Sequence, residues 1–405
     1  MLKKTSFPAI IISTFIATSF GIISIGHILS NKPLLFLNYM KSYGLDYADF
    51  FKASEKIIDG QSPYDISTNR YVTTPIPAIA NTIFVPLGFN NARILFYFLI
   101  PLSLAFGYQL ITSMFGFTKI DKDLILTAGL IGLLFGYPFY FLLQRENIDG
   151  WVFLFLCLGL YWLQNPKKEW ASGLFFSLAI VFKVYPVLIV LPILLSKRWR
   201  LFFWIGLWLV LWGVITLFWF SDFQTALSSR SQSLFRLDEN GSLVATTSLI
   251  SILINSLGIS SVDLLVNLSP IITVLIYGIL LSLVIFADYK LGKVNNLELS
   301  SYTMYLPFMI ALPLLVYHYS FILCLILIPT MCHLWGVSET RAQRKTIFVI
   351  STGIALTQWQ AIATYSLTEN MLSHAIPGLG LLLIMAGITF FKVYTLRLTQ
   401  REMNS

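Results

Sequence analysis

Apolar runs of membrane-spanning length recur from one end of this 405-residue chain to the other. Each crossing of a bilayer needs roughly 20 apolar residues, usually as a helix. Only 11% of the residues are charged, against about 25% in soluble proteins, and 57% are hydrophobic. The sequence therefore predicts an all-α, polytopic transmembrane protein with a single membrane domain over residues 1–405.

The apolar stretches predict individual spans. They cover residues 7–29, 92–115, 124–143, 148–163, 201–220, 264–286, 299–316, 321–335, 347–365 and 375–391. The first stretch is longer than the ~7–15 apolar residues of a signal peptide. It therefore predicts an uncleaved span with a cytoplasmic N-terminus.

The net charge of +8 is concentrated in short loops that include NPKKEW, SKRWR and SETRAQRK. Lys and Arg gather in the cytoplasmic loops of membrane proteins, so the excess predicts an orientation rather than a nucleic-acid partner. All basic loops and both termini lie in the cytoplasm if residues 171–196 cross and return and residues 73–89 do not cross. This topology has about 12 helices.

Residues 31–91 are predicted to form the first extracytoplasmic loop, and residues 44–65 are its most acidic and polar part. Apolar residues at helical spacing predict a helix over 47–59 that stops at Gly60. Its narrow apolar side favours a juxtamembrane helix that lies in the interface. Residues 73–89 are apolar but interrupted by prolines, which indicates a re-entrant segment; a full crossing is the alternative.

The apolar stretch 171–196 is interrupted by FKVYP, where Pro186 disfavours a helix before it. We expect two helices to meet at Lys183. In this topology five polar segments lie on the outer face: residues 44–65, 144–147, the break at Lys183, a second large outer loop at 221–247, and residues 317–320. Their presence on one side of the membrane is what an active site requires.

Asp46 and Asp49 lie in the first loop, close to where a lipid-borne substrate arrives. As N-cap and N3 residues, they would complement the dipole of the helix that follows. In the alternative interpretation, Asp49 is a general base that takes a proton from an acceptor hydroxyl, and Asp46 contacts the sugar or acceptor. The residues alone leave both interpretations open.

Lys183 is an ionisable residue within an apolar run, which is costly and indicates a function. With Tyr185 and freed backbone donors beside it, we expect it to bind a phosphate; the alternative is a side chain that extends to the headgroups. His318, next to Tyr319, is either a second phosphate ligand or an interfacial residue of an aromatic belt.

Three other sites carry candidate residues for the sugar or acceptor. Gln144 and Asn147 form either a tight polar turn or part of a sugar site, because amides pair well with hydroxyls. Arg230 meets either a lipid phosphate or anionic headgroups, and Tyr64 is a candidate in the first loop. The sequence has no Walker loop, HExxH or GxSxG elbow in a supporting context, and its four histidines lack metal spacing.

Several short motifs, taken in order, resemble those of a known family. They are DFFKASEKIIDGQSPYD, PIP at 75–77, Q-x-x-N at 144–147, FKVYP at 182–186 and HYS at 318–320. This series resembles the polyprenol-phosphate-sugar-dependent glycosyltransferases of the GT-C superfamily, and most closely glycosyltransferase family 87, the bacterial alpha-mannosyltransferase group. The resemblance runs from about residue 46 to residue 320.

The resemblance implies roles for individual residues. Asp49 would activate the acceptor hydroxyl, while Lys183 and His318 would bind the donor phosphate. Gln144 and Asn147 would line the sugar site.

The resemblance implies an inverting transfer of a hexose, with mannose as the expected sugar, from a polyprenyl-phosphate sugar to a lipid-linked or glycan acceptor. No cofactor is implied beyond this donor substrate. The implied location is a bacterial inner membrane, with the active site on the extracytoplasmic face. The alternative from the residues alone is a transporter or flippase of lipid-linked saccharides, which would use the same cavity without chemistry.

Overall fold

The computed structural model describes residues 7–12, 45–64, 71, 73–231, 262–291, 299–311, 318–358 and 371–404. All regular elements within these ranges are helices, as the composition predicts. Five helical segments in the described ranges are long and apolar enough to cross a membrane: Phe89–Ser113, Trp199–Leu217, Ile271–Leu291, Ser320–Val337 and Ala375–Glu402. The chain is therefore a multi-pass membrane protein. The count of about 12 helices and the cytoplasmic termini stay predictions, and most of the first span lies outside the described residues.

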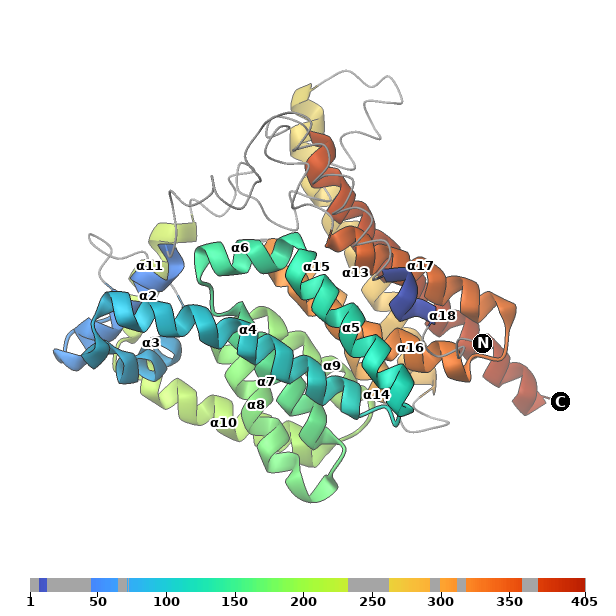
Figure 1. Cartoon of the computed structure of the whole chain (residues 1–405), viewed down its shortest axis with the longest axis horizontal. Helices are drawn as coiled ribbons and strands as arrows, with labels where there is room; N and C mark the ends of the chain where they lie inside the picture. The colour runs from blue at the N-terminus through green and yellow to red at the C-terminus, as the bar shows by residue number, and fades with distance from the viewer. Residues whose placement is uncertain are drawn as a thin grey trace.

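Four helices of the first half of the chain pack side by side (Figure 1). In order of contact they are α4 (Phe89–Ser113), α7 (Asp149–Leu163), α8 (Glu169–Phe182) and α10 (Trp199–Leu217). The outermost, α10, leaves Phe203, Val210 and Leu217 more than 60% exposed. Their seven-residue spacing places them on one helical face, as expected of a stripe that faces lipid.

The first polar stretch folds into α2 (Leu45–Ile58), close to the predicted helix. Gly60 ends it with a φ of 70°, and the N–H of Gln61 bonds to the carbonyl of Lys56 at 2.7 Å. This is the glycine-dependent C-terminal motif of helices, so the predicted stop is confirmed. On the buried side of α2, the hydroxyl of Ser54 donates to the carbonyl of Ala78 at 2.9 Å.

That contact joins α2 to α3 (Pro75–Asn81), which continues as the 3₁₀ helix η3 (Thr82–Leu87). At ~1.5 and ~2.0 Å per residue, the two together are about 22 Å long, short of the ~30 Å hydrocarbon core. The length favours the predicted re-entrant segment over a full crossing, which was the alternative.

The predicted span 124–143 is wrong as a single helix. The structure has α5 (Lys119–Phe135) and α6 (Tyr137–Arg145), separated by Gly136 in an extended conformation. Pro138 explains the break, because it lacks a backbone donor and its ring crowds the turn before it.

The predicted break within 171–196 is confirmed. Helix α8 ends at Phe182, and Lys183 is extended, with φ −146° and ψ 136°. The chain continues as η5 (Tyr185–Ile189) and α9 (Val190–Leu195). Of the predicted outer loop 221–247, residues 221–231 are described, and they form all of α11 (Phe220–Ser231) except its first residue; the rest lies outside the described residues.

The second half of the chain forms a further group of helices (Figure 1). Its members are α13 (Val262–Leu291), α14 (Leu299–Thr303), α15 (Leu306–Ala311), η6 (His318–Ile326), α16 (Leu327–Val337), α17 (Arg341–Thr357) and α18 (Met371–Asn404). Helix α6 packs on η6, and η5 packs on α15, so the two groups meet beside the break at Lys183.

Helices α17 and α18 approach each other most closely at two glycines. A Cβ atom at Gly353 would lie 2.7 Å from the carbonyl oxygen of Gly380, and one at Gly380 would lie 2.7 Å from that of Gly353. Such contacts between small residues let membrane helices pack backbone to backbone.

Candidate active site

Asp46 connects α2 to the turn after α6. Its Oδ1 atom lies 2.7 Å from Nη2 of Arg145, and its Oδ2 atom accepts a hydrogen bond from Nδ2 of Asn147 at 2.6 Å. The predicted role of Asp46 as an N-cap is wrong, because α2 begins one residue earlier and the carboxylate is engaged across the site. Two predicted residues, Asp46 and Asn147, are thus in direct contact although 101 positions separate them.

The turn itself is held by Glu146, a non-glycine residue in the left-handed region with φ 52° and ψ 50°. This conformation costs about 1–2 kcal/mol for a residue with a Cβ atom. The side chain offsets that cost by contact with Arg93 on α4, whose Nε donates to Oε1 at 2.7 Å. Burial raises the pKa of Glu146, and Arg93 opposes that rise. A glycine would fit the turn but would lose the link to α4.

From the turn the network continues into α7. The Oδ1 atom of Asn147 accepts the backbone N–H of Asp149 at 3.1 Å. The Asp149 side chain is fully buried, and three side chains converge on it. Oη of Tyr185 donates to Oδ2 at 3.1 Å, the hydroxyl of Ser320 donates to the same oxygen, and Nζ of Lys183 lies 3.6 Å from Oδ1.

Polar groups from α2, the turn 145–147, the break at Lys183 and η6 therefore belong to one connected network. These are four of the five segments predicted to share the outer face. The fifth is adjacent: the ring of Phe223 on α11 lies 5.4 Å from that of Tyr64, which follows α2.

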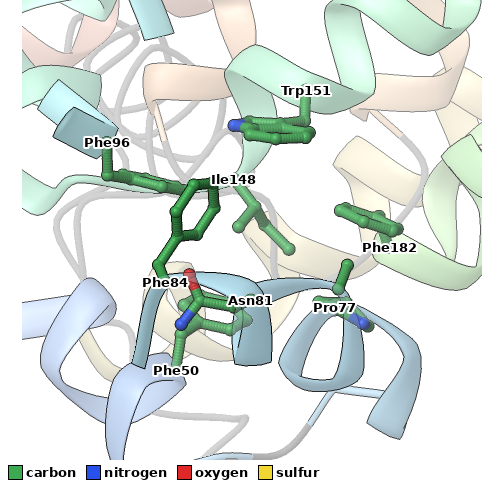
Figure 2. Close-up of a pocket in the computed structure, with 9 residues that line it drawn as sticks. Phe50, Pro77, Asn81, Phe84, Phe96, Ile148, Trp151 and Phe182 are labelled. Carbon is green, nitrogen blue, oxygen red and sulfur yellow. The ribbon is translucent and has the colours of Figure 1, made fainter. Parts of the chain in front are cut away.

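An apolar pocket adjoins this network in the chain. Its volume is about 20 Å³, room for about one water molecule, and it is partly open to the outside. In Figure 2, Trp151 and Phe50 lie on opposite sides of it, with Phe96 and Phe182 at its flanks. Phe50 directly follows the predicted site residue Asp49, and Phe182 directly precedes the predicted site residue Lys183.

Two polar atoms lie in the walls of the pocket. Within the described residues, neither Nε1 of Trp151 nor Oδ1 of Asn81 has a hydrogen-bond partner. Asn81 is only 6% exposed. The aromatic lining resembles that of ligand sites, which are much larger, at about 300–1,000 Å³.

Asp49 lies one turn after Asp46 on α2 and is partly buried. Residues three apart share a helical face, so the two carboxylates are neighbours on the surface of α2. The role of Asp49 as a general base stays a prediction.

The other predicted residues divide into two groups. Tyr64 is buried, and its hydroxyl donates to the carbonyl of Thr73 at 2.8 Å; its contact with sugar or acceptor stays a prediction. The backbones of four residues are placed in α6, α11 and η6, but their side chains lie outside what the structure describes. These four are Gln144, Arg230, His318 and Tyr319.

Sequence reasoning missed the residue at the centre of the network. Asp149 stands two positions after Asn147, at the start of an apolar run, where an acidic residue is common in a first helical turn. Its partners Tyr185 and Ser320 are 36 and 171 residues away, so no local sequence pattern predicts the cluster. The polar turn beside it was the signal that pointed to this region.

Chemically, the arrangement offers a cationic amine, hydroxyls, amides and carboxylates beside an apolar pocket. The ammonium and hydroxyls suit an anionic group, and the amides and carboxylates suit sugar hydroxyls. Among the residues that the structure describes, no group of three or more His, Cys, Asp or Glu side chains gathers to hold a metal ion.

Comparison with known proteins agrees with this chemistry. Residues 71–313 match the sequence profile of glycosyltransferase family 87. GPI mannosyltransferase 1 of Kluyveromyces lactis is 32% identical over 173 residues, which are 40% of this chain and 41% of that protein. The chain thus matches about two fifths of the length of this curated relative.

Proposed function

This chain belongs to glycosyltransferase family 87, and on that basis we propose that it transfers a mannosyl residue from a polyprenyl-phosphate sugar to a lipid-linked or glycan acceptor. The proposal places the reaction on the extracytoplasmic face of a bacterial cell membrane. The choice of mannose is supported by the name of the Kluyveromyces lactis relative, a GPI mannosyltransferase.

The observation that carries the proposal is the single polar network formed by Asp46, Asn147, Asp149 and Lys183. An ionisable side chain at membrane depth is costly, and a network that pairs it beside an apolar pocket supports a site rather than a scaffold.

In the proposed reaction, an acceptor hydroxyl attacks the anomeric carbon of a beta-linked donor, and the bond from that carbon to the phosphate oxygen breaks. Asp49 takes the hydroxyl proton, and the configuration inverts. The polyprenyl phosphate leaves with its bonding electron pair and needs no proton. Lys183 and His318 stabilise the charge that develops on it, where a poorly hydrated site makes such donors most effective.

The direct test uses the full chain in lipid nanodiscs, with radiolabelled polyprenyl-phosphate mannose and a panel of lipid and glycan acceptors. We expect Asp49→Asn to lower turnover by about 10²–10⁴-fold, the usual contribution of a general base, and to leave donor binding intact. The matched control is Asp59→Asn, which changes an exposed carboxylate at the end of the same helix.

Near wild-type turnover in Asp49→Asn would disprove the assigned base. Movement of the labelled lipid across the bilayer without transfer to any acceptor would instead favour a flippase.

A further inference from the structure

Asp149 is held in place on one side only. Its Oδ2 atom accepts hydrogen bonds from the hydroxyls of Tyr185 and Ser320, and its backbone N–H donates to Asn147. Among the described residues, its Oδ1 atom accepts no hydrogen bond, although the side chain is fully buried. A buried carboxylate oxygen in this state costs free energy, so it calls for a functional explanation.

The group nearest to that oxygen is the ammonium of Lys183. The distance of 3.6 Å from Nζ to Oδ1 is an ion pair, longer than a charge-assisted hydrogen bond. The Lys183 side chain is 21% exposed, so part of it remains accessible beside the ion pair.

The Lys183 side chain needs a partner to hold it in place, because its backbone does little to restrict its conformation. It stands at the extended residue between α8 and η5, where no helical turn restricts the side chain. A lysine side chain has about 2 kcal/mol of rotamer entropy to lose when it is ordered. A fixed carboxylate supplies part of that order before any anion arrives, which is the advantage of a preorganised site.

We propose that Asp149 is a positioning residue that fixes the ammonium of Lys183 at the chain break, with Tyr185 and Ser320 fixing the carboxylate in turn. The ligand that this arrangement takes is the phosphate of a polyprenyl phosphate. This assignment rests on the proposed function for the identity of the donor, but the coupling between Asp149 and Lys183 is measurable without it.

The test is a double-mutant cycle of Asp149→Asn and Lys183→Met in nanodiscs. It has two readouts: kcat and KM for polyprenyl-phosphate mannose, and the Kd of undecaprenyl phosphate by isothermal titration. A residue that acts through another loses its effect when that partner is gone. We expect Asp149→Asn to weaken phosphate binding and to lower kcat/KM by about 10-fold alone, and by less than about 3-fold in the Lys183→Met background.

The matched control is Asp288→Asn, which neutralises the other fully buried carboxylate paired with a lysine in the described residues. Its effect on Kd should be small in both backgrounds. Ser320→Ala is a milder second variant if Asp149→Asn does not fold; it should weaken binding only while Lys183 is present.

Equal effects of Asp149→Asn in both backgrounds, or none in either, would overturn the positioning role even if the wild type transfers mannose. If the wild type transfers no sugar but the cycle shows coupling in the Kd, the positioning role stands and the proposed function fails.

Discussion

Two buried carboxylates in this protein have almost the same partners. They differ in how far the paired lysine is shielded from the outside. Asp149 is contacted by Lys183, Tyr185 and Ser320. Asp288 on α13 is contacted by Lys392 and Tyr305, and its serine, Ser301, is bonded to the lysine instead. Both side chains are 0% exposed, and in each case the tyrosine hydroxyl donates to Oδ2 at 3.1 Å.

The two clusters differ in how close the lysine lies to the carboxylate and in how exposed it is. Nζ of Lys392 lies 2.7 Å from Oδ1 of Asp288, donates to Ser301 at 2.5 Å, and belongs to a side chain that is 6% exposed. Nζ of Lys183 lies 3.6 Å from its carboxylate on a side chain that is 21% exposed. The Asp288 cluster is therefore enclosed, whereas the Asp149 cluster can be reached from outside, as a ligand site requires.

The largest expected effect is on stability, at the closed cluster. Lys392→Met leaves Asp288 buried without its cation, so we expect a loss of about 3–5 kcal/mol in the free energy of unfolding. Unfolding in detergent, followed by circular dichroism, measures it. The protein that remains folded should transfer sugar at the wild-type rate; a selective loss of turnover would erase the distinction between the clusters.

The same substitution at the open cluster should act on chemistry. We expect Lys183→Met to lower kcat by about 10²–10³-fold, the usual effect of removing a group that stabilises developing charge. Its effect on unfolding should be smaller than that of Lys392→Met, because Lys183 is already partly exposed. Steady-state transfer and the unfolding assay together check this; a stability loss equal to that of Lys392→Met would contradict it.

The two tyrosines allow a finer comparison. Tyr305→Phe should cost about 1–3 kcal/mol in unfolding, because Oδ2 of Asp288 loses its hydroxyl donor. Tyr185→Phe should cost about 1 kcal/mol, since Ser320 still donates to Oδ2 of Asp149, but it should raise KM for the donor. Unfolding and KM measured on both variants test the pair, and a raised KM in Tyr305→Phe would count against it.

The smallest effect concerns a third buried carboxylate, Glu146, at the strained turn. Its pKa is raised in the folded state, so between its usual value and the folded value the folded protein binds more protons than the unfolded chain. The stabilisation that the folded protein gains from this bound proton is full below the unfolded pKa of Glu146. It is lost as the pH rises through the folded pKa. Glu146→Gln should remove this slope from unfolding measured between pH 4 and 8. Glu339→Gln, at an exposed site, should retain it.

The sequence predicts well what depends on neighbours in the chain. Long apolar runs gave α4 and α10, and Pro186 with the charge of Lys183 indicated the break after α8. Pro138 carries a similar signal for the break at Gly136, but apolar residues on both sides concealed it. The order of polar motifs also indicated the family that the comparison of residues 71–313 shows.

Local sequence patterns do not predict contacts between residues that are distant in the chain. Nothing near Asp149 in the chain indicates that Ser320 donates to it, and nothing near Asp46 indicates Arg145 as its partner. Burial distinguishes Asp149 from Asp46 and Asp49, and burial depends on how α7 packs against α8 and η6. The network is a property of the assembled helices.

The close approach of α17 and α18 has a consequence for how this protein evolves. A single added methyl group at either Gly353 or Gly380 meets the opposite backbone, so no one-step substitution at these positions keeps the helices at their present separation. At Gly387 the nearest atom is in the side chain of Ile350, so a smaller residue at 350 can relieve that contact. Homologous chains should therefore retain small residues at positions 353 and 380 together, or lose both where the two helices lie further apart.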